Sequence, residues 1–558
     1  MTSRDEPTWY SRPTDRRQAL KSLGLGAAAL SVPGLLAACG GGSSPASSGS
    51  SGPVSAARIA SLNWALPTST IVGLDIATAF EANTACVQVL GLEGLLTVSD
   101  SLGLVPLLAT SWKYLESEKK YVFQIRQGVK FWDGTPMTPA DVAFSLSRHI
   151  DPKVSSQIGA YLANVDAFTV TGANEVTAHL KRPDPLVANT LPFAPILSKA
   201  FVERVGKALG TPGSTVNIMG TGPFKITAFP SSTAATVERN DGYWGPAPVV
   251  GKCTFSCIPD PQTLLLAMQS GQVDGTFNVP VQQTADWQRL SNASLNSAPG
   301  MFIAYLSFDL SQAPYNDLHV RKAFAYAANR AGYVKAFLGG NGTPAACMVP
   351  PQQWGSVLPQ AQVQKLYAGL PSYPYSMAMA KKELAQSKFP HGFTTNKVLA
   401  PSNYPAVVKT LESLSTTVKA MGINMPVQQV TSNEWLANIY AHKDMGIATV
   451  LYSPDYADPA DYLNLSYPSA NAVKNNFNTA NFKNPAVDKL LEKANAAATN
   501  AERAQYLGQV LTISQQQLPY LGLFWQNDVM SIQDHYVYKG FTGLFYNQNW
   551  LTRISAAT

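Results

Sequence analysis

The sequence predicts an α/β protein with two or more lobes, and three observations support this prediction. Segments with the two-residue apolar alternation of β-strands are interleaved along the chain with segments that repeat at the helical period. Apolar residues make up 46% of the chain and charged residues 14%, which is typical of a globular protein with large cores. The length of 558 residues exceeds what one hydrophobic core usually serves, so more than one lobe is expected.

The clearest local pattern is the segment 121–148, YVFQIRQGVKFWDGTPMTPADVAFSLSR. Apolar residues alternate with polar ones from Tyr121 to Phe131, interrupted by a glycine, which predicts a β-hairpin. Thr138 then stands at an expected helix N-cap, Pro139 at the first helical position, and Asp141 where it completes a capping box. A strand pair followed by a capped helix is therefore predicted.

The part of this segment from Arg126 to Ser145 also resembles a family signature. It matches the block RxGVxFxDGxPxxxxDVxFS of the family 5 extracellular solute-binding proteins, which are the peptide and nickel binders of ABC importers. The resemblance extends from about Ile59 to Phe541, with further motifs in the family's order. These are EGLL at 93–96, PLLATSW at 106–112, GTGPFKI at 220–226, IPD at 258–260 and QLPY at 517–520.

The resemblance implies the two-lobed periplasmic-binding-protein fold of type II, in its large form with an inserted subdomain. It places lobe 1 at residues 58–300 and 525–558, the inserted subdomain at about 92–190, and lobe 2 at 301–524. The chain is expected to cross between the lobes near residues 300–309 and 519–527. The ligand would lie in the cleft between the lobes, which close on it by hinge motion, and the protein is expected to be a monomer.

The N-terminus resembles an export signal. Arg16 and Arg17 precede an uncharged run at residues 22–38 that is too short and too rich in Gly and Ala for a membrane span. Residues 1–38 are therefore predicted to be a signal peptide. The two arginines resemble a twin-arginine export motif, and ordinary Sec export is the alternative.

A lipid anchor is expected to follow the signal. The sequence LAAC at residues 36–39 resembles a lipobox, in which Cys39 takes a diacylglyceryl group. Two or three acyl chains on Cys39 would hold the protein at a membrane surface. Residues 39–57 are rich in Gly and Ser and are expected to form a flexible tether. The predicted location is extracytoplasmic, in the periplasm or on the outer face of the cell membrane.

The net charge and the cysteine content exclude few classes of protein. Removing residues 1–38 takes away five basic and three acidic residues, so the formal net charge of +6 becomes +4. A charge this mild gives no argument for nucleic acid as a partner. Beyond Cys39 there are four cysteines, for which one disulfide and free buried thiols are both open alternatives.

The sequence predicts no catalytic residue, no metal-ligand set and no cofactor. It contains no HExxH, CxxC, GxSxG or GxxxxGK[ST] motif, and its six histidines are scattered singly. Binding without reaction is therefore predicted, and a secreted hydrolase is the alternative of another class. Within the binding class, the alternatives to a peptide are an oligosaccharide, an opine-like solute and a metal chelate.

The best binding candidate is the segment 451–459, LYSPDYADP, which follows the apolar run 445–450. A strand that leaves a core for a proline-rich loop delivers polar residues to the rim of a cleft. In the peptide-binding branch of the resembled family, an aspartate at the position of Asp455 pairs with the ligand's α-ammonium group. A fixed carboxylate suits an amine that loses its hydration in a dry cleft. The alternative for Asp455, and more so for Asp458, is to cap a helix that begins at Pro459.

Four further residues complete the expected site. Tyr452 sits where the family often has a tryptophan, and Ser453 is expected to offer backbone groups to an extended peptide. Trp64 and Trp525 are candidate apolar walls of the cleft, with a core role as the alternative for each. The predicted function is capture of a di- or oligopeptide and its delivery to the permease subunits of an ABC transporter.

Overall fold

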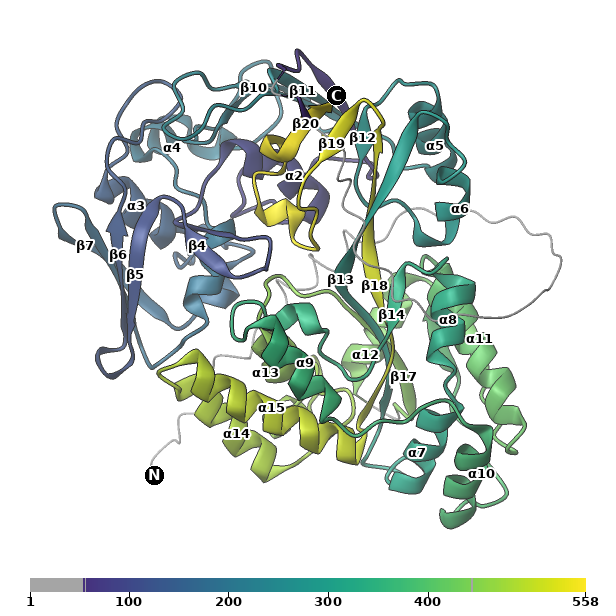
Figure 1. Ribbon diagram of the computed structural model, residues 1–558. Helices are drawn as coiled ribbons and strands as arrows, with labels where there is room; N and C mark the ends of the chain where they lie inside the picture. Colours follow the sequence, from purple (N-terminus) through teal and green to yellow (C-terminus); the bar gives the residue numbers. More distant parts are fainter. Residues whose placement is uncertain (1–53, 56, 443–444) are drawn as a thin grey trace.

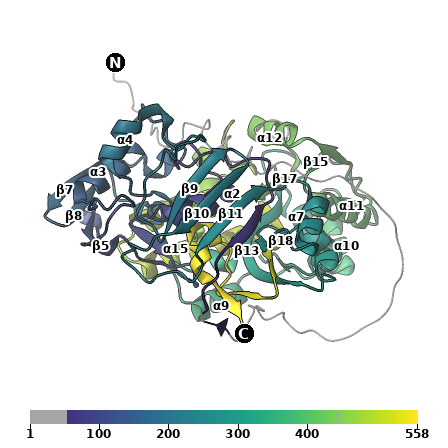
Figure 2. The same ribbon diagram turned by 90° about the horizontal axis from the view of Figure 1, so that it is seen from above.

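The computed structural model describes residues 54–55, 57–442 and 445–558, and its central feature is a mixed sheet that runs through the molecule (Figure 1). Among the described residues the sheet has nine strands. In spatial order they are β17 (Ile447–Tyr452), β13 (Ala293–Phe308), β18 (Tyr520–Gln533), β12 (Gly275–Thr276), β2 (Leu62–Leu66), β11 (Lys252–Cys257), β10 (Ala234–Arg239) and β9 (Phe224–Ser231), with β14 (Gly342–Pro344) on β18. Figure 2 shows β9, β10 and β11 side by side.

The two longest strands, β13 and β18, join an upper part of the molecule (residues 57–292 and 534–558) to a lower part (residues 309–519). They pair antiparallel from Ala293 opposite Gln533 to Ser307 opposite Tyr520, with a register shift between Ala298 and Phe302. Within the shift, a Cβ on Gly300 would come within 2.3 Å of the Gln526 carbonyl oxygen, so glycine is required there. Both expected crossings, 300–309 and 519–527, overlap these strands, and the exact lobe boundaries stay a prediction.

In the upper part, helices and short strands pack around one end of the sheet. Its helices are α2 (Ala82–Gly91), α5 (Pro261–Gln269) and α6 (Thr284–Trp287), and its small strands are β1 (Val54–Ser55), β3 (Leu96–Val98), β4 (Leu104–Pro106), β19 (Tyr536–Tyr538) and β20 (Ile554–Ala557). Strand β1 pairs with β20, so the end of the predicted tether at 54–55 is structured. The free edge of β20 supplies the backbone partners for it. The signal peptide, Arg16, Arg17, Cys39 and residues 39–53 lie outside the described residues.

The segment predicted to be the inserted subdomain, called the subdomain below, contains an antiparallel sheet of the order β5-β6-β8-β7, covered by a helix. Its elements are β5 (Ala109–Leu115), β6 (Lys120–Ile125), β7 (Val165–Gly172), β8 (Glu175–Leu180) and α3 (Pro139–Arg148), followed by α4 (Lys199–Val205). The predicted capping box is confirmed, since Thr138 and Asp141 exchange side-chain to backbone bonds at the start of α3. The predicted hairpin over 121–131 is wrong. Strands β5 and β8 occupy both edges of β6, so the segment after Gly128 has no edge to pair with.

The lower part is mostly helical around the other end of β13, β17 and β18. Its helices are α7 (Leu318–Ala327), α8 (Arg330–Phe337), α9 (Gln360–Ala368), α10 (Met377–Gln386), α11 (Pro405–Lys419), α12 (Ser432–Ala441), α13 (Pro459–Ser466), α14 (Pro485–Ala496) and α15 (Asn500–Gln517), and a parallel pair joins β15 (Val398–Pro401) to β16 (Val427–Val430). Asn484 caps α14 and Pro485 stands at its start. The fold is therefore of the α/β class in both parts.

Short 3-10 turns complete the described structure. They are η2 (Glu116–Glu118), η3 (Gly159–Leu162), η4 (Val187–Phe193), η5 (Gly206–Ala208), η6 (Val281–Gln283), η7 (Pro351–Trp354), η8 (Ser469–Asn471), η9 (Phe545–Asn547) and η10 (Trp550–Arg553). Cys86, Cys253, Cys257 and Cys347 are free thiols, which decides between the two alternatives for them. In the described parts of the chain, each helix is too short or too polar to cross a lipid bilayer.

Candidate functional site

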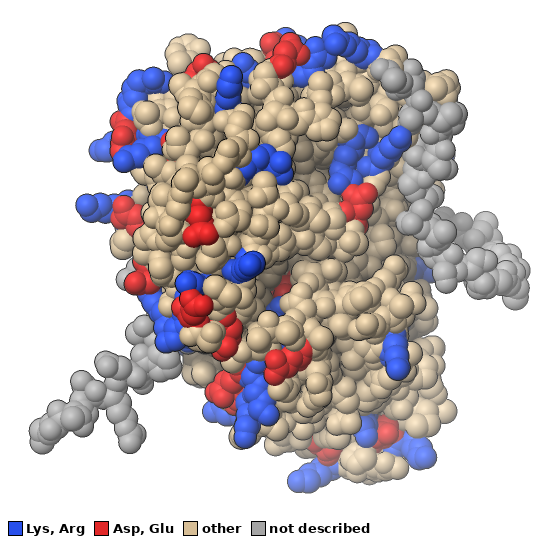
Figure 3. All heavy atoms as spheres, turned by 60° about the vertical axis from the view of Figure 1, so that its left-hand side comes forward, with Lys and Arg blue, Asp and Glu red and all other residues tan. Residues whose placement is uncertain are grey.

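A large cavity lies between the inserted subdomain and the lower part of the molecule. Its volume is about 970 Å³. One wall comes from residues 149–166 and 181–190, and the other from Tyr440 and residues 456–465, 475–477 and 492–496. In Figure 3 this face of the molecule is hollowed between its upper and lower parts, with acidic and basic side chains around the hollow. A volume at the upper end of the usual range for ligand pockets makes this cavity the leading binding site.

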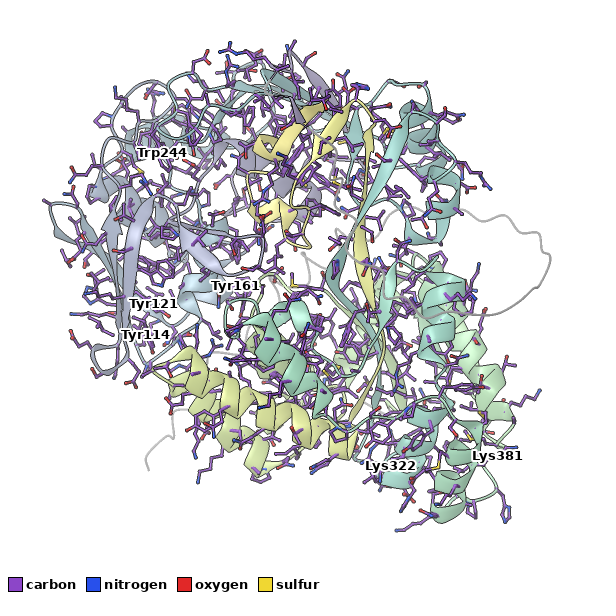
Figure 4. The ribbon with its side chains drawn as sticks, viewed as in Figure 1. Tyr114, Tyr121, Tyr161, Trp244, Lys322 and Lys381 are labelled. Carbon is purple, nitrogen blue, oxygen red and sulfur yellow. The ribbon has the colours of Figure 1, made fainter. Side chains whose placement is uncertain are left out.

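Asp455 is not among the residues that line the cavity, but it contacts one lining residue of each wall. The Tyr161 hydroxyl, from the inserted subdomain, donates to the Asp455 carboxylate. The Asp455 amide donates to the Asp461 carboxylate at 3.2 Å, and the Asn547 side-chain amide donates to the Asp455 carbonyl at 3.2 Å. Asp455 itself is half-buried, whereas Tyr161 and Asp461 line the cavity. Figure 4 shows Tyr161 where the subdomain meets the lower part.

Asp458 has a different role. Its carboxylate forms a two-pronged ion pair with Arg503 of α15, at 2.7 and 2.9 Å, and both side chains are buried. It also accepts from the Ala460 amide, which caps α13. Burial alone would lower the pKa of Arg503, but the Asp458 carboxylate outweighs burial and raises it. Asp458 is therefore the N-cap of α13, as the helix-cap alternative predicts, and Asp455 is not.

Tyr452 and Ser453 leave β17 beside the cavity. The Tyr452 ring packs edge-on against Tyr462, with centroids 4.8 Å apart, and against Phe477 at 6.5 Å. Of these rings, Phe477 lines the cavity. Ser453 is exposed. The segment 451–455 thus reaches the cavity mainly through the partners of Tyr452 and Asp455.

Trp64 does not line the cleft. It is fully buried in the upper core, with its ring centroid 4.5 Å from that of Trp550 and 4.8 Å from that of Phe277. The expected cleft wall is therefore wrong for Trp64, because β2 lies between β11 and β12 inside the sheet and α2 with the C-terminal segment covers it. The alternative core role describes this residue.

Trp525 lines a second, smaller cavity at the register shift of the long strands. This cavity has a volume of about 110 Å³ and is also lined by Pro299, Gly300 and Asn527. Trp525 is 5% exposed, and its indole nitrogen is buried without a hydrogen-bond partner in the described structure. It is therefore placed at the junction of the two parts, away from the large cavity.

Acidic groups concentrate near the Asp455 loop. Burial raises the pKa of Tyr546, and the charges of Asp455 and Asp528 raise it further. Tyr546 belongs to the C-terminal segment, so these carboxylates approach it from the lower part and from β18. Burial also raises the pKa of Asp528 to about 7. In the cavity wall, burial lowers the pKa of His149 to about 4, so His149 is neutral at neutral pH.

Sequence reasoning missed the aromatic and amide lining of the cavity. The lining includes four aromatic residues and three asparagines, namely Tyr161, Tyr440, Tyr456, Phe477, Asn464, Asn475 and Asn476. Tyr161 and Tyr456 meet edge-on at 6.0 Å across the two walls. Neither wall carries a local motif that marks these residues, because the contact joins segments almost 300 positions apart. The Tyr440 and Phe477 pair, edge-on at 5.4 Å, comes from two segments of the lower part.

The cavity offers carboxylates, amides and aromatic rings, a set suited to binding a polar or positively charged solute. Among the described residues, no group of three or more His, Cys, Asp or Glu side chains is arranged to hold a metal ion.

Several of the family-like motifs form a separate buried network in the upper part. Glu93 accepts from the hydroxyl groups of Tyr243 at 2.7 Å and Thr221 at 2.8 Å, and from the Trp244 indole at 3.2 Å. Burial raises the pKa of Glu93. The Arg126 guanidinium lies 4.5 Å from the centroid of the Trp244 ring, which Figure 4 labels. The motifs EGLL and GTGPF therefore meet in the scaffold and not in the cavity.

Residues 103–474 match the model of the bacterial extracellular solute-binding proteins, family 5 middle region. The chain belongs to this family. Its members are solute-binding proteins that act outside the cytoplasm with ABC permeases, not enzymes.

Relatives and solved structures agree with the assignment. The chain is 26% identical over 438 residues to the glutathione-binding protein GsiB of Escherichia coli O1:K1 / APEC, covering 77% of this chain and 82% of the relative. CtaP from Listeria monocytogenes, an ABC transporter substrate-binding protein, matches with a TM-score of 0.77 and 20% identity over 90% of this chain and all of that one. DppA from Helicobacter pylori, in complex with the peptide STSA, matches with a TM-score of 0.70 and 21% identity, over 90% and 99% of the two chains. These structures confirm the two-lobed α/β fold.

Proposed function

We propose that this solute-binding protein captures a di- or oligopeptide and delivers it to the permease subunits of an ABC transporter. The observation that supports a peptide best is the placement of Asp455, whose loop contacts Tyr161 of one cavity wall and Asp461 of the other. An ammonium group brought to this position meets a fixed carboxylate at the junction of the two walls. A charge-assisted bond of that kind offsets the hydration that the amine loses.

The relatives favour the same class of solute. GsiB is a glutathione-binding protein, and the DppA structure holds a peptide. Glutathione is itself a small peptide with a free amine, so an aspartate that receives an amine suits both cases. A neutral sugar has no positive group for the Asp455 carboxylate to receive, which makes the oligosaccharide alternative less suited to this site.

The remaining expected residues take supporting roles in the proposal. Tyr452 packs against Phe477, which lines the cavity, and the exposed Ser453 offers its backbone groups to an extended peptide. Trp525, at the joint of the two parts, contributes an apolar surface near the hinge. Export through Arg16 and Arg17, lipidation of Cys39 and a monomeric state belong to the same proposal and rest on the sequence.

The experiment compares Asp455→Ala with the wild type. Binding of a peptide library is measured by calorimetry, after native mass spectrometry has named any solute that is carried through purification. Asp455→Ala is expected to weaken peptide binding roughly a hundredfold, about 3 kcal/mol, because it removes the counter-charge of the amine. Its unfolding temperature without solute should stay within a few degrees. The control Asp534→Ala changes an exposed carboxylate just beyond the last residue of β18. Equal affinity of Asp455→Ala and wild type would remove Asp455 from the site.

A further inference from the structure

The large cavity carries an excess of negative charge on its walls. Its described lining contains five carboxylates and two cationic side chains, and His149 adds no positive charge at neutral pH because burial lowers its pKa to about 4. The carboxylates are those of Asp151, Asp166, Asp184, Asp461 and Glu492, and the cations are Lys181 and Arg182. The chain as a whole has a formal net charge of +6, so the cavity has the opposite sign from the molecule around it.

Three of these carboxylates have no ion pair in the described structure within 4.0 Å, namely Asp151, Asp166 and Glu492. Asp184 differs from them, because burial raises its pKa and the nearby charge of Arg182 acts against that rise. Lys181 instead donates to the Ala163 carbonyl at 2.9 Å. The cavity lining therefore has more acidic than basic side chains, an arrangement that attracts a positively charged solute.

Asp461 places one of these carboxylates beside the proposed amine site. It is 4% exposed, lies in the first turn of α13, and accepts from the Asp455 amide at 3.2 Å. Asp461, which lines the cavity, therefore contacts the backbone of Asp455. Asp166 and Glu492 are exposed on opposite walls, from the subdomain and from α14.

The aromatic lining favours the same ligand chemistry independently of the carboxylates. Tyr161 and Tyr456 from opposite walls, and Tyr440 and Phe477 from the lower part, all line the cavity. The face of an aromatic ring attracts an ammonium or guanidinium group by about 0.5–2 kcal/mol. Rings and carboxylates in one cavity thus select the same sign of charge.

We infer that the preferred solute is a basic peptide, with its amino terminus at Asp455 and Asp461 and a positively charged side chain between the acidic walls. This inference rests on the proposed function, since it assigns the charge of the peptide that the same cavity takes. A cavity of about 970 Å³ is large enough for several residues, so the two positive groups have room to reach separate carboxylates.

The first test compares three peptides of equal length that differ in one side chain: Ala-Lys-Ala, Ala-Met-Ala and Ala-Glu-Ala. Calorimetry with the wild-type protein at low salt should give about tenfold tighter binding for the lysine peptide than for the methionine peptide. The glutamate peptide should bind more weakly than both. Raising the salt to about 0.5 M should narrow the differences, because mobile ions screen exposed charges.

The second test removes charge from the walls without disturbing the fold. The double variant Asp166→Asn/Glu492→Gln changes two exposed carboxylates that have no described side-chain hydrogen bond or ion pair. The preference for lysine over methionine should fall about fivefold, while affinity for the methionine peptide stays unchanged. The matched control Glu412→Gln/Asp534→Asn removes the same charge from exposed positions elsewhere and should keep the preference.

The outcomes separate the two claims. If the methionine peptide binds as tightly as the lysine peptide, the inference of a basic solute is overturned and the proposed peptide function stands. The same holds if both double variants reduce the preference equally, since the effect would then come from net charge alone. If the protein binds none of these peptides or a wider library, the proposed function fails and the inference fails with it.

Discussion

Asp455 and Asp458 are three residues apart in one loop, yet the structure uses their carboxylates in opposite ways. Asp458 is enclosed, with a two-pronged ion pair to Arg503 and a helix to cap. Asp455 is half-buried and receives its hydroxyl donor, Tyr161, from the other wall of the cavity. A carboxylate whose partners all lie in the lower part, such as Asp458, stabilises the fold. A carboxylate with partners on both cavity walls, such as Asp455, changes its contacts when the walls move apart or when a solute enters between them.

The largest expected effect on stability concerns Asp458, the enclosed carboxylate of this pair. Arg503→Met leaves the Asp458 carboxylate buried without its counter-charge, which should lower the free energy of unfolding by about 4 kcal/mol. Chemical denaturation measures the loss. The double variant Arg503→Met/Asp458→Asn removes the stranded charge and should recover part of it. A single variant as stable as the wild type would show that the ion pair is not what holds this loop to α15.

A second prediction concerns Asp528 of β18, whose charge acts on Tyr546 together with that of Asp455. Burial raises the pKa of Asp528 to about 7, so the folded protein keeps a proton that the unfolded chain releases. Stability should therefore fall as the pH rises from about 4 to 7 and stay lower above that window. Asp528→Asn should gain about 1–2 kcal/mol at pH 8 and almost nothing at pH 4. Thermal unfolding across this pH range measures it.

The control for that experiment is Asp534→Asn, which changes an exposed carboxyl group just beyond the same strand. It should shift unfolding equally little at both pH values. A gain for Asp528→Asn that is the same at pH 4 and pH 8 would contradict the role of the Asp528 charge.

The smallest expected effect on stability concerns Asp455, the carboxylate whose partners come from both walls. Tyr161→Phe removes the hydroxyl that reaches Asp455 and keeps the ring that meets Tyr456. The free energy of unfolding should fall by about 1 kcal/mol or less, since the bond is only partly buried. Affinity for a peptide should change severalfold, because the carboxylate loses the donor that orients it. Tyr114→Phe, within the subdomain, is the control and should leave peptide affinity unchanged.

Local signals predicted the parts of the fold that depend on neighbouring residues. The start of α3 was predicted correctly from Thr138, Pro139 and Asp141, because a capping box is complete within four positions. The predicted hairpin over 121–131 was wrong because strand pairing depends on segments that are distant in the sequence. The edge of β6 is paired with β8, which lies more than 50 residues later in the chain. Trp64 shows the same limit, since a tryptophan at a strand end suits a core and a cleft equally until the covering elements are known.

The candidate site was predictable only in part for a similar reason. The family-like motif pointed to Asp455, and the helix-cap rule pointed to Asp458. Tyr161 and the acidic lining of the subdomain carry no spacing that links them to residue 455. Their relation to the loop arises from the packing of one part on another, which no pattern within either segment records.

The central position of β18 also governs the order in which the molecule assembles. β18 pairs with β12, β13 and β14, yet it begins only at Tyr520, more than 200 residues after β13. Until that strand has been synthesised, the sheet exists as two unjoined halves with open edges. Contacts between segments so distant form slowly, so completion of the sheet should be the late, shared step of folding for both parts.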